Sequence, residues 1–560
     1  MRTLIQIAVL TFVVSVGNAS TMPATYDTIV VGLGSAGATA ASTLAKAGRR
    51  VLALEAQDRI GGRVKTVPFG DGVVEEGAEW IHGTGMSRVY ETAIKSNISV
   101  VPQDLTFKVY KSDGSMANDS LINELLDYCL ARIEDPPEKP EALGKFITRS
   151  LLDYLKENHP DVLKDEDFVN EFLELMNLLI NNYEASDDWN DVSAQTEYKE
   201  LDGHQHMSWH RYGYKTFFDI LLNTYNNGPG WPTLDIKLNK EVTLIKWPKN
   251  STGNVEVVCK DGDVYRANNV IVTVSLGVLK ERYSTLISPP IPQTKKTAID
   301  KLSFGVIGKI ILSFPQRWLR SNSYLFFYRS EDKNNFSNDT WLTKLEGVTS
   351  PSGSSNTVTL WTSGDVTRLE KVKIIEKISI GVMDKVILNF EKQWLPSGKF
   401  FGFFWRAEEK KKVSKEDYWT TRIFACSTPM GSRTAITFWT SGEVGKLVET
   451  LPEDVVKRKV MGLLRQFLGK DLTVPEPTGM IRSKWFSNPF TRGSYTYDNL
   501  LMHEYPNARA TLGEPLVDEA GVPKVLFAGE ATDLIHFSTV HGASDSGYRE
   551  AMRLLPSSKV

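Results

Sequence analysis

The chain has 560 residues, 41% of them hydrophobic and 24% charged, which is ordinary globular composition and excludes wholesale disorder, collagen and coiled coil. At roughly 150 residues per domain, the length suggests about three or four domains, or fewer large ones. The 65 Lys and Arg residues nearly balance the 68 Asp and Glu residues, so the net charge of −3 gives no reason to expect a nucleic-acid partner. Cys129, Cys259 and Cys426 cannot form a disulfide framework and lack metal-ligand spacing, so we expect no metal site.

Residues 1–19 have the pattern of a secretory signal peptide. Arg2 precedes an apolar run from Leu4 to Val16, and small residues then occupy the two positions that a signal peptidase reads. The run is short for a membrane span, and no later stretch is apolar enough to cross a bilayer. We therefore expect secretion or passage through the secretory pathway. A peroxisomal or cytoplasmic location is the alternative, because residues 558–560 loosely match a peroxisomal tripeptide.

A glycine-rich turn opens the rest of the chain. Residues 26–31 have the apolar pattern of a buried strand, and glycines in GxGxxG spacing separate them from an Ala-rich helix that ends at Gly48. Gly32 permits the tight turn, Gly34 lets backbone N–H groups approach a pyrophosphate, and Gly37 lets the helix pack on the strand. We expect a dinucleotide site at the N-terminus of this helix, formed by Gly32, Gly34, Ser35, Ala36 and Gly37.

A second strand and a second pair of glycines extend this site. Residues 51–54 read as a strand, and Glu55, followed by Ala56, comes where a carboxylate can accept the ribose hydroxyls. A glycine pair and Arg63 follow soon after, and they indicate further backbone and charge contacts to the same diphosphate. Nicotinamide enzymes do not need this extension, whereas it resembles the GG motif of FAD-dependent amine oxidases.

Further segments carry the same resemblance along the chain. They are GAEWIHG at 77–83, VTLIKW at 242–247, IVTVSLGVLK at 271–280, WFSNPFTRGSYTY at 485–497, and a closing run at 526–551 that contains FAGEAT, STVHGA and SGYREA. These motifs cover nearly all of the chain after the signal, and the closing run is the most specific of them. The chain resembles the flavin-containing amine oxidase family, and within it the spermine and polyamine oxidases most closely.

The resemblance implies a mixed α/β and α+β fold of two discontinuous domains. A Rossmann-like FAD-binding domain is expected over 24–105, 234–290 and 478–556. A substrate-binding domain, with a sheet and helices that cover the flavin, is expected over 106–233 and 291–477.

The closing run also has a physical interpretation of its own. Gly529 ends an expected strand and lets the backbone approach a cofactor, and Glu530 can accept hydrogen bonds from ribityl hydroxyls. A helix expected over 541–555 would point its N-terminal dipole at the flavin. No cysteine falls near this run, so we expect noncovalent FAD. Besides Glu55, Ala56 and the glycine-rich turn, the motifs imply cofactor contacts by Arg63, Gly77, Ala78, Glu79, Trp80, Val242, Trp485, Gly529, Glu530, Thr539 and Val540.

The family resemblance implies the oxidation of a polyamine such as spermine, spermidine or an acetylated form. A hydride equivalent would pass from the carbon beside a secondary amine to flavin N5, and water would split the resulting imine into an aminoaldehyde and a smaller amine. Molecular oxygen would then reoxidise the flavin and yield hydrogen peroxide. The protein would place the carbon, exclude water and favour the neutral amine.

Five side chains match substrate-side residues of the family. His82 matches a histidine near the substrate amine, and Tyr495 matches one wall of an aromatic cage beside the flavin. Glu184 and Ser186 resemble an acid and a serine that bind the distal amine, through an alignment with a one-residue gap. Thr539 lies in STVHGA, where the family has STTHGA. Val540 replaces the second threonine of that motif, and the loss of its hydroxyl leaves the identity of the substrate open. The structural alternative for His82 is a histidine that is hydrogen-bonded within a turn, and the alternative for Tyr495 is an aromatic residue of the core.

The middle of the chain repeats itself, over about 294–369 and 370–447. IDKLSFGVIGKIILSFPQRWL in the first copy matches IEKISIGVMDKVILNFEKQWL in the second, and TLWTSGDV around Trp361 matches TFWTSGEV around Trp439, 78 residues later. Two copies are too few for a solenoid. We hypothesise that two alternative versions of one segment are joined in a single chain.

The family has one such segment, with a lysine that holds a water near flavin N5. Lys309 and Lys385, 76 positions apart, both match it, and only one can occupy that place. Lys385 has the closer match because Asp384 supplies the family's acidic neighbour, whereas Lys309 follows the flavin-domain strand directly. We favour Lys385.

Other functions stay open at this point. The chain could oxidise another amine or an L-amino acid, although no arginine can be assigned to a substrate carboxylate. It could also bind flavin without activity if the extra repeat blocks the tunnel. A histone demethylase is not favoured, since no chromatin-reading domain or long helical insertion is present. The oligomeric state is not predicted.

Overall fold

The structure is a computed structural model of the whole chain. It describes residues 26–103, 108–111, 115–117, 119–186, 188–250, 253–313, 323–329, 347–350, 357–363, 381–469, 472–499 and 505–556. Within 304–382 mainly the backbone of the strands is described. The predicted signal peptide at 1–19 lies outside these residues.

The first of two large sheets has a parallel centre that the sequence pattern predicts. Its strands β1 and β2 are the two apolar runs on either side of the glycine-rich turn, and both are buried. β12, β1, β2 and β9 run parallel in that order, and β25 joins β12 on the side away from β1. The nine strands are β1 (Tyr26–Val31), β2 (Val51–Leu54), β9 (Leu234–Lys237), β10 (Val242–Lys246), β11 (Val255–Cys259), β12 (Val264–Val272), β13 (Ile287–Ser288), β24 (Leu516–Val517) and β25 (Pro523–Phe527).

Two helices of small residues pack tightly beside this sheet. α1 (Ser35–Lys46) and α14 (Val540–Arg553) lie against each other, with Thr39 Oγ1 2.9 Å from Ser544 Oγ. A Cβ on Gly547 would lie 2.0 Å from the carbonyl oxygen of Ala36, so only glycine permits this approach. The other helices of this half are α2 (Arg88–Lys95), α7 (Lys215–Leu221), α8 (Leu276–Leu286), α9 (Gln293–Lys301) and α13 (Ala508–Gly513).

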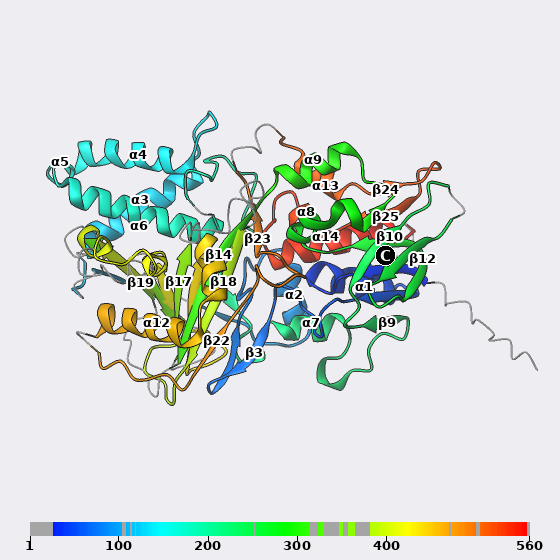
Figure 1. The fold of residues 1–560 in the computed structure, drawn as a ribbon, viewed down its shortest axis with the longest axis horizontal. Coiled ribbons are helices and arrows are strands. Elements are labelled where there is room, and N and C mark those ends of the chain that lie inside the picture. Colours follow the sequence, from blue (N-terminus) through cyan, green and yellow to red (C-terminus); the bar gives the residue numbers. More distant parts are fainter. Residues whose placement is uncertain are drawn as a thin grey trace, which may run out of the picture.

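The second sheet has eleven described strands and forms the other half of the molecule (Figure 1). In that view, α3, α4 and α6 lie above this sheet, and α12 lies beside it toward the opposite end. The strands are β7 (Lys108–Lys111), β14 (Ser303–Ser313), β15 (Ser323–Arg329), β16 (Gly347–Ser350), β17 (Thr357–Ser363), β18 (Gly381–Asn389), β19 (Lys399–Arg406), β20 (Ala425–Ser427), β21 (Ala435–Ser441), β22 (Gly479–Arg482) and β23 (Tyr495–Tyr497). The helices are α3 (Asp119–Glu134), α4 (Leu143–Asn158), α5 (Pro160–Leu163), α6 (Glu166–Glu184), α10 (Ala407–Lys410), α11 (Gly442–Thr450) and α12 (Glu453–Leu468).

α6 shows how the helices of this half are held to their sheet. Phe172, Leu175, Met176 and Leu179 recur at helical spacing and are at most 1% exposed, so one face of the helix is buried in the core. Asp165 caps the helix by accepting a hydrogen bond from the Phe168 amide at 3.1 Å. Burial of this face fixes the C-terminal end of α6, which reaches the cavity described below.

Short strands join the two halves. They are the hairpin of β3 (Thr66–Phe69) and β4 (Gly72–Glu75), and the small sheet of β5 (Trp80–Ile81), β6 (Val101–Pro102) and β8 (Met207–Ser208). The mixed α/β and α+β architecture predicted from the sequence is confirmed. The exact domain boundaries remain a prediction: the first sheet takes its strands from the ranges assigned to the FAD-binding domain, but β22 and β23 of the second sheet also lie within one of these ranges, 478–556.

Candidate active site

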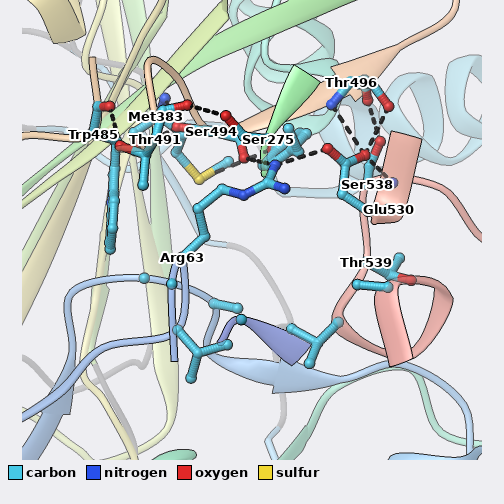
Figure 2. A pocket seen from close by; sticks show the side chains of 18 of the residues that line it. Arg63, Ser275, Met383, Trp485, Thr491, Ser494, Thr496, Glu530, Ser538 and Thr539 are labelled. Atoms are coloured by element: carbon cyan, nitrogen blue, oxygen red, sulfur yellow. Dashed lines mark hydrogen bonds and ion pairs between the residues drawn. The ribbon is translucent and has the colours of Figure 1, made fainter. Parts of the chain in front are cut away.

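A cavity of about 940 Å³ lies between the two halves. Its lining begins at the carboxyl ends of β1 and β2, passes the second sheet at β18 and β21, and ends among α3, α6 and residues 196–200. Ligands bind at the carboxyl ends of parallel strands in open α/β sheets, so the location itself is typical of a cofactor site. Figure 2 shows the part of this cavity around Arg63 and Glu530.

The glycine-rich turn has the geometry that a diphosphate needs. Gly32 has a φ of +97°, which favours glycine, and a Cβ on Gly37 would lie 1.9 Å from the Gly32 carbonyl oxygen. A Cβ on Gly34 would come only to 3.9 Å from Gly62 Cα. Gly34 and Gly62 thus leave a backbone-lined channel at the first turn of α1, where no side chain caps the amides. This cradle fits the pyrophosphate of a dinucleotide.

These glycines give a matched set of predictions. Gly37→Ala will disrupt the packing of α1 on β1 and lower the melting temperature, because its Cβ would collide with backbone. Gly34→Ala will keep the melting temperature of the ligand-free protein but lose flavin binding, because the protein has room for this Cβ and the diphosphate does not. Gly462→Ala in α12, whose Cβ would meet nothing within 4 Å, is the control. Full flavin occupancy in Gly34→Ala would contradict this placement of the diphosphate.

Glu55 lies at the end of β2 and is 5% exposed. Its Oε2 accepts a hydrogen bond from the Leu33 amide at 2.7 Å, and its Oε1 accepts one from the Gln57 amide at 2.9 Å. Burial raises the pKa of this carboxyl, and the two amides oppose the increase. A carboxylate has about four acceptor positions, so Glu55 keeps capacity for ribose hydroxyls.

Arg63 and Glu530 form the charged centre of the cavity (Figure 2). Arg63 Nη1 donates to Glu530 Oε1 at 2.7 Å and to the carbonyl oxygen of Ser494. Glu530 Oε2 accepts from Thr496 Oγ1 at 2.8 Å and from the Ser538 amide at 3.0 Å. Although burial opposes its ionisation, the Arg63 guanidinium and these donors hold the pKa of Glu530 below its usual range. Glu530 therefore stays ionised and fixes the Arg63 side chain in the cavity.

A buried arginine behind this pair escaped the sequence reasoning. Arg509 donates to Thr496 Oγ1 and to Asp498 Oδ1, both at 2.8 Å, and is 3% exposed. Arg509 belongs to none of the motifs found in the sequence. The only sequence feature that could have indicated it was its position soon after the aromatic run at 485–497. Arg509 orients Thr496 toward Glu530 and so belongs to the same network.

Thr539 and Val540 mark the N-terminus of α14, and both line the cavity. Thr539 caps the helix, since its hydroxyl accepts from the Gly542 amide at 3.0 Å and donates to the His536 carbonyl at 2.6 Å. Ser35 donates to the Val540 carbonyl at 2.9 Å, which links the N-termini of α1 and α14. Two helix dipoles therefore point their positive ends at this region.

Lys385 lies on the other side of the cavity, on β18. Its Nζ is 3.5 Å from Glu79 Oε2 and 4.5 Å from the centroid of the Trp439 ring. The Lys385 and Glu79 side chains are 1% and 2% exposed, so this ion pair is shielded from water apart from the cavity. Trp80 stacks on Trp439 with ring centroids 5.3 Å apart. Tyr495, on β23, lines the same wall.

The acid beside Lys385 holds the neighbouring loop. Asp384 Oδ1 accepts from the Ser483 hydroxyl at 2.9 Å and from the Trp485 amide at 2.7 Å. Burial, together with the adjacent Glu449, raises the pKa of Asp384 well above its usual range. Asp384 therefore positions Trp485 through these hydrogen bonds, and its raised pKa disfavours the charged form.

His82 faces a second histidine in the cavity. The ring centroids of His82 and His206 are 5.9 Å apart, and Trp80 contacts both rings edge-on. Burial lowers the pKa of His82 to about 4 and that of His206 to about 3, so both are neutral at pH 7. A neutral imidazole can accept a hydrogen bond from an amine through its unprotonated ring nitrogen. His206 was missed, although the unassigned His-Gln-His run at 204–206 was a signal.

The far end of the cavity is an acidic arm, by which we mean the lining at Leu130, Ile133, Glu134, Leu143, Ile180, Asn182, Tyr183, Glu184, Thr196, Tyr198 and Glu200. Burial, with the nearby charge of Asp498, raises the pKa of Glu184 to about 7. Burial also raises the pKa of Glu200, with Glu134 adding to the increase. None of the described residues of this arm is basic, so it attracts cations.

The cavity brings together most of the side chains predicted from the sequence. Ser186 does not line it: the residue is fully buried and donates to Asn181 Oδ1 at 2.8 Å. Gly37 supports the turn from behind, and the Lys309 side chain lies outside the described residues. The predicted residues that line the cavity are Gly32, Gly34, Ser35, Ala36, Glu55, Ala56, Arg63, Gly77, Ala78, Glu79, Trp80, His82, Glu184, Val242, Lys385, Trp485, Tyr495, Gly529, Glu530, Thr539 and Val540.

The cavity thus joins a dinucleotide cradle to an aromatic and acidic region, an arrangement that suits a flavoenzyme acting on amines. The family model described as flavin containing amine oxidoreductase matches residues 35–347 and 348–555, and the chain belongs to this family. Membership implies a flavin cofactor. The resemblance predicted from the sequence motifs is confirmed.

The individual relatives share at most about 28% sequence identity with this chain among those described here. "Probable polyamine oxidase 5" of Arabidopsis thaliana is 28% identical, over 94% of this chain and 97% of that protein. The human "Peroxisomal N(1)-acetyl-spermine/spermidine oxidase" is 27% identical, over 97% of each chain. "Lysine-specific histone demethylase 1 homolog 2" of Arabidopsis thaliana is 25% identical, over 94% of this chain and 58% of that protein. Across the described residues, no helix is both long and apolar enough to cross a membrane.

Proposed function

We propose that the protein oxidises polyamines such as spermine, spermidine or their acetylated forms at a secondary amine. FAD would accept the hydride at N5, and the products would be an aminoaldehyde, a smaller amine and hydrogen peroxide, with oxygen as the final acceptor. The observation that carries this proposal is that one cavity joins the dinucleotide cradle to the acidic arm. A long, flexible polycation fits a cavity with this charge at its far end.

Noncovalent binding of FAD is supported by the lining of the cavity. Cys129, Cys259 and Cys426 are all buried elsewhere, and none of them belongs to the lining. Gly34, Glu55 and Arg63 would hold the diphosphate and ribose, and the N-terminus of α14 would face the ring. Denaturation should therefore release the flavin unmodified.

The side chains around the reacting carbon can prepare the amine. Trp80, Tyr495 and Trp439 supply aromatic walls that exclude water and favour the neutral amine. His82 and His206, neutral at pH 7, can accept a hydrogen bond from the amine. Lys385 would hold a water beside the reacting centre, as the family resemblance implies.

The acidic arm makes a testable contribution to affinity. Glu184 is neutral below its pKa of about 7 and charged above it, so the KM for spermine should fall as pH rises through 7. Glu184→Gln should raise the KM about tenfold at pH 8, with little change in kcat, because a hydrogen bond to a charged group contributes about 1.5–3 kcal/mol. It should also remove this pH dependence. Glu138→Gln, at an exposed position outside the cavity lining, is the control and should change KM less than threefold, in keeping with the ~1 kcal/mol limit for exposed pairs. Equal effects of the two changes would contradict this role of Glu184.

The activity should be measured on a panel of amines. Spermine, spermidine, their acetylated forms, L-amino acids and a methyl-lysine peptide are each added to the flavin-loaded protein, and peroxide is measured. An amino-acid oxidase would need an arginine for the carboxylate, but the arginines among the described lining, Arg63 and Arg282, are bonded to Glu530 and Glu241. We expect turnover of polyamines alone, and turnover of an L-amino acid or the peptide alone would overturn the proposal.

We further propose that residues 1–19 direct the protein to the secretory pathway. One relative is named as peroxisomal, so the peroxisome is the second location to test. The full chain with its C-terminus left free, with and without residues 1–19, is located with an antibody in the medium and in cell fractions, which distinguishes the two. Export that depends on residues 1–19 supports the proposal, and peroxisomal import would contradict it.

A further inference from the structure

The two repeats occupy equivalent places in the second sheet. β14, from the first repeat, and β18, from the second, both pair with β21 of the second repeat, where Lys309 and Lys385 each stand opposite Trp439. Both strands also pair with β22, where Leu312 and Leu388 each stand opposite Met480. Positions that correspond in the repeat therefore share the same partners.

The same holds for the next strands. β15 and β19 both pair with β7, where Leu325 and Gly402 each stand opposite Val109. Leu325 and Gly402 also share Gly347 on β16 as a partner. The two strands are thus aligned residue by residue on the same neighbouring strands.

A sheet cannot hold both copies in these places. The two neighbours of a strand lie about 9–10 Å apart, twice the spacing between strands, so they cannot also pair with each other. Yet β14, β18 and β21 are all mutually paired, as are β7, β15 and β19. The second sheet has one place for this segment, and two segments fit it.

We propose that the two repeats are alternative occupants of a single position in the second sheet, so that each folded molecule contains one of them there. Lys385 and Trp439 of the second copy line the cavity, and the first copy has the same residue types at the corresponding positions, Lys309 and Trp361. The chemistry can therefore survive an exchange of copies.

The exchange would change the wall of the cavity. Met383 and Phe400 line it from the second copy, and the repeat places Ile307 and Ser323 at the corresponding positions of the first. Serine in place of phenylalanine would make that wall wider and more polar. Given the proposed function, the occupying copy would select between slim and bulkier polyamines, for example spermine and its acetylated form.

Hydrogen exchange on the full, flavin-loaded chain tests the occupancy without reference to activity. The protected fraction of amides in β14 and in β18 is measured by mass spectrometry, with β1 as the fully folded reference. We expect the two fractions to add up to about that of β1. A sum near twice that value would show that both copies are in place, and a sum near zero would show that neither is. Either result would overturn the proposal. Cys426, buried in β20 of the second copy, gives a second readout: its reactivity with a thiol reagent should rise with the fraction of β18 that is unprotected.

Two deletion variants test the consequence for the substrate. Removal of residues 303–378 leaves the second copy, and removal of 364–441 leaves the first, each joined at matching repeat positions. Both should fold and bind flavin, and the first-copy chain should have the higher ratio of kcat/KM for the acetylated over the free polyamine. Phe400→Ser in the second-copy chain should raise that ratio, and Ser323→Phe in the first-copy chain should lower it. If only one variant folds, or if the ratios are equal, the two copies are not interchangeable as proposed. If neither chain oxidises any amine while hydrogen exchange shows one copy in place, the proposed function fails and the shared position stands.

Discussion

Replacement of Lys385 by methionine is expected to lower kcat by about 100-fold or more, the usual contribution of a group that positions a proton or a water in the reaction. Lys385 reaches the cavity from β18, with its charge held by Glu79 and by the face of Trp439. Methionine fills a similar volume without the ammonium. The measurement is the rate of flavin reduction and of reoxidation in the chain that lacks residues 303–378, because Lys309, the equivalent lysine of the first copy, is absent from it.

The repeat supplies the matched control. In the full chain, Lys309→Met and Lys385→Met should each remove the activity of only those molecules in which that copy occupies the sheet, and the double variant should remove all of it. A stable Lys385→Met protein with unchanged kcat in the second-copy chain would exclude the proposed role. If the variant instead melts at a lower temperature and its lost activity matches the fraction of unfolded protein, Lys385 would be assigned to folding.

Replacement of Arg63 by alanine is expected to abolish flavin binding and to destabilise the protein by about 3–5 kcal/mol, because it leaves the Glu530 carboxylate buried without its charge partner. The Glu530 side chain is 4% exposed, and its remaining donors, Thr496 and Ser538, carry no charge. Loss of Arg63 therefore raises the pKa of Glu530, and the stability deficit should be largest above that pKa, where the carboxylate must ionise.

Glu530→Gln and the double variant Arg63→Met/Glu530→Gln separate the two effects. The double variant removes the uncompensated charge, so it should recover most of the free energy of unfolding measured by denaturant, but it should not recover flavin binding. Lys95→Ala, which breaks the exposed Lys95–Glu91 pair in the same half of the molecule, is the control for loss of a basic residue. Full recovery of flavin in the double variant would show that Arg63 acts only on the fold.

The cofactor half of the molecule was predictable because its constraints are local. Gly32 is required by the positive φ of the turn and Gly37 by its contact with Gly32, both within one strand–turn–helix unit, and Glu55 follows directly at the end of the next strand. Such a unit can be recognised without knowledge of the rest of the fold. The predicted helix at 541–555 is likewise found as α14, at 540–553.

The substrate half was less predictable because its site is assembled from distant segments. Glu134 ends α3, Glu184 ends α6, and Glu200 lies in a loop, so their approach depends on how the helices pack rather than on any sequence spacing. Ser186 was selected with Glu184 from the same tetrapeptide, yet the chain turns at Ala185, whose φ is +57°, and Ser186 lies in the interior. His206 and Arg509 likewise gain their meaning only from contacts made across the fold.

Anaerobic mixing of the flavin-loaded protein with spermine tests the central proposal most directly. The visible absorbance of the flavin should disappear at a rate that saturates with spermine, and admission of oxygen should restore it with one peroxide formed per amine oxidised. Flavin that stays oxidised with spermine, spermidine and their acetylated forms, in protein shown by hydrogen exchange to be folded, would contradict a polyamine oxidase.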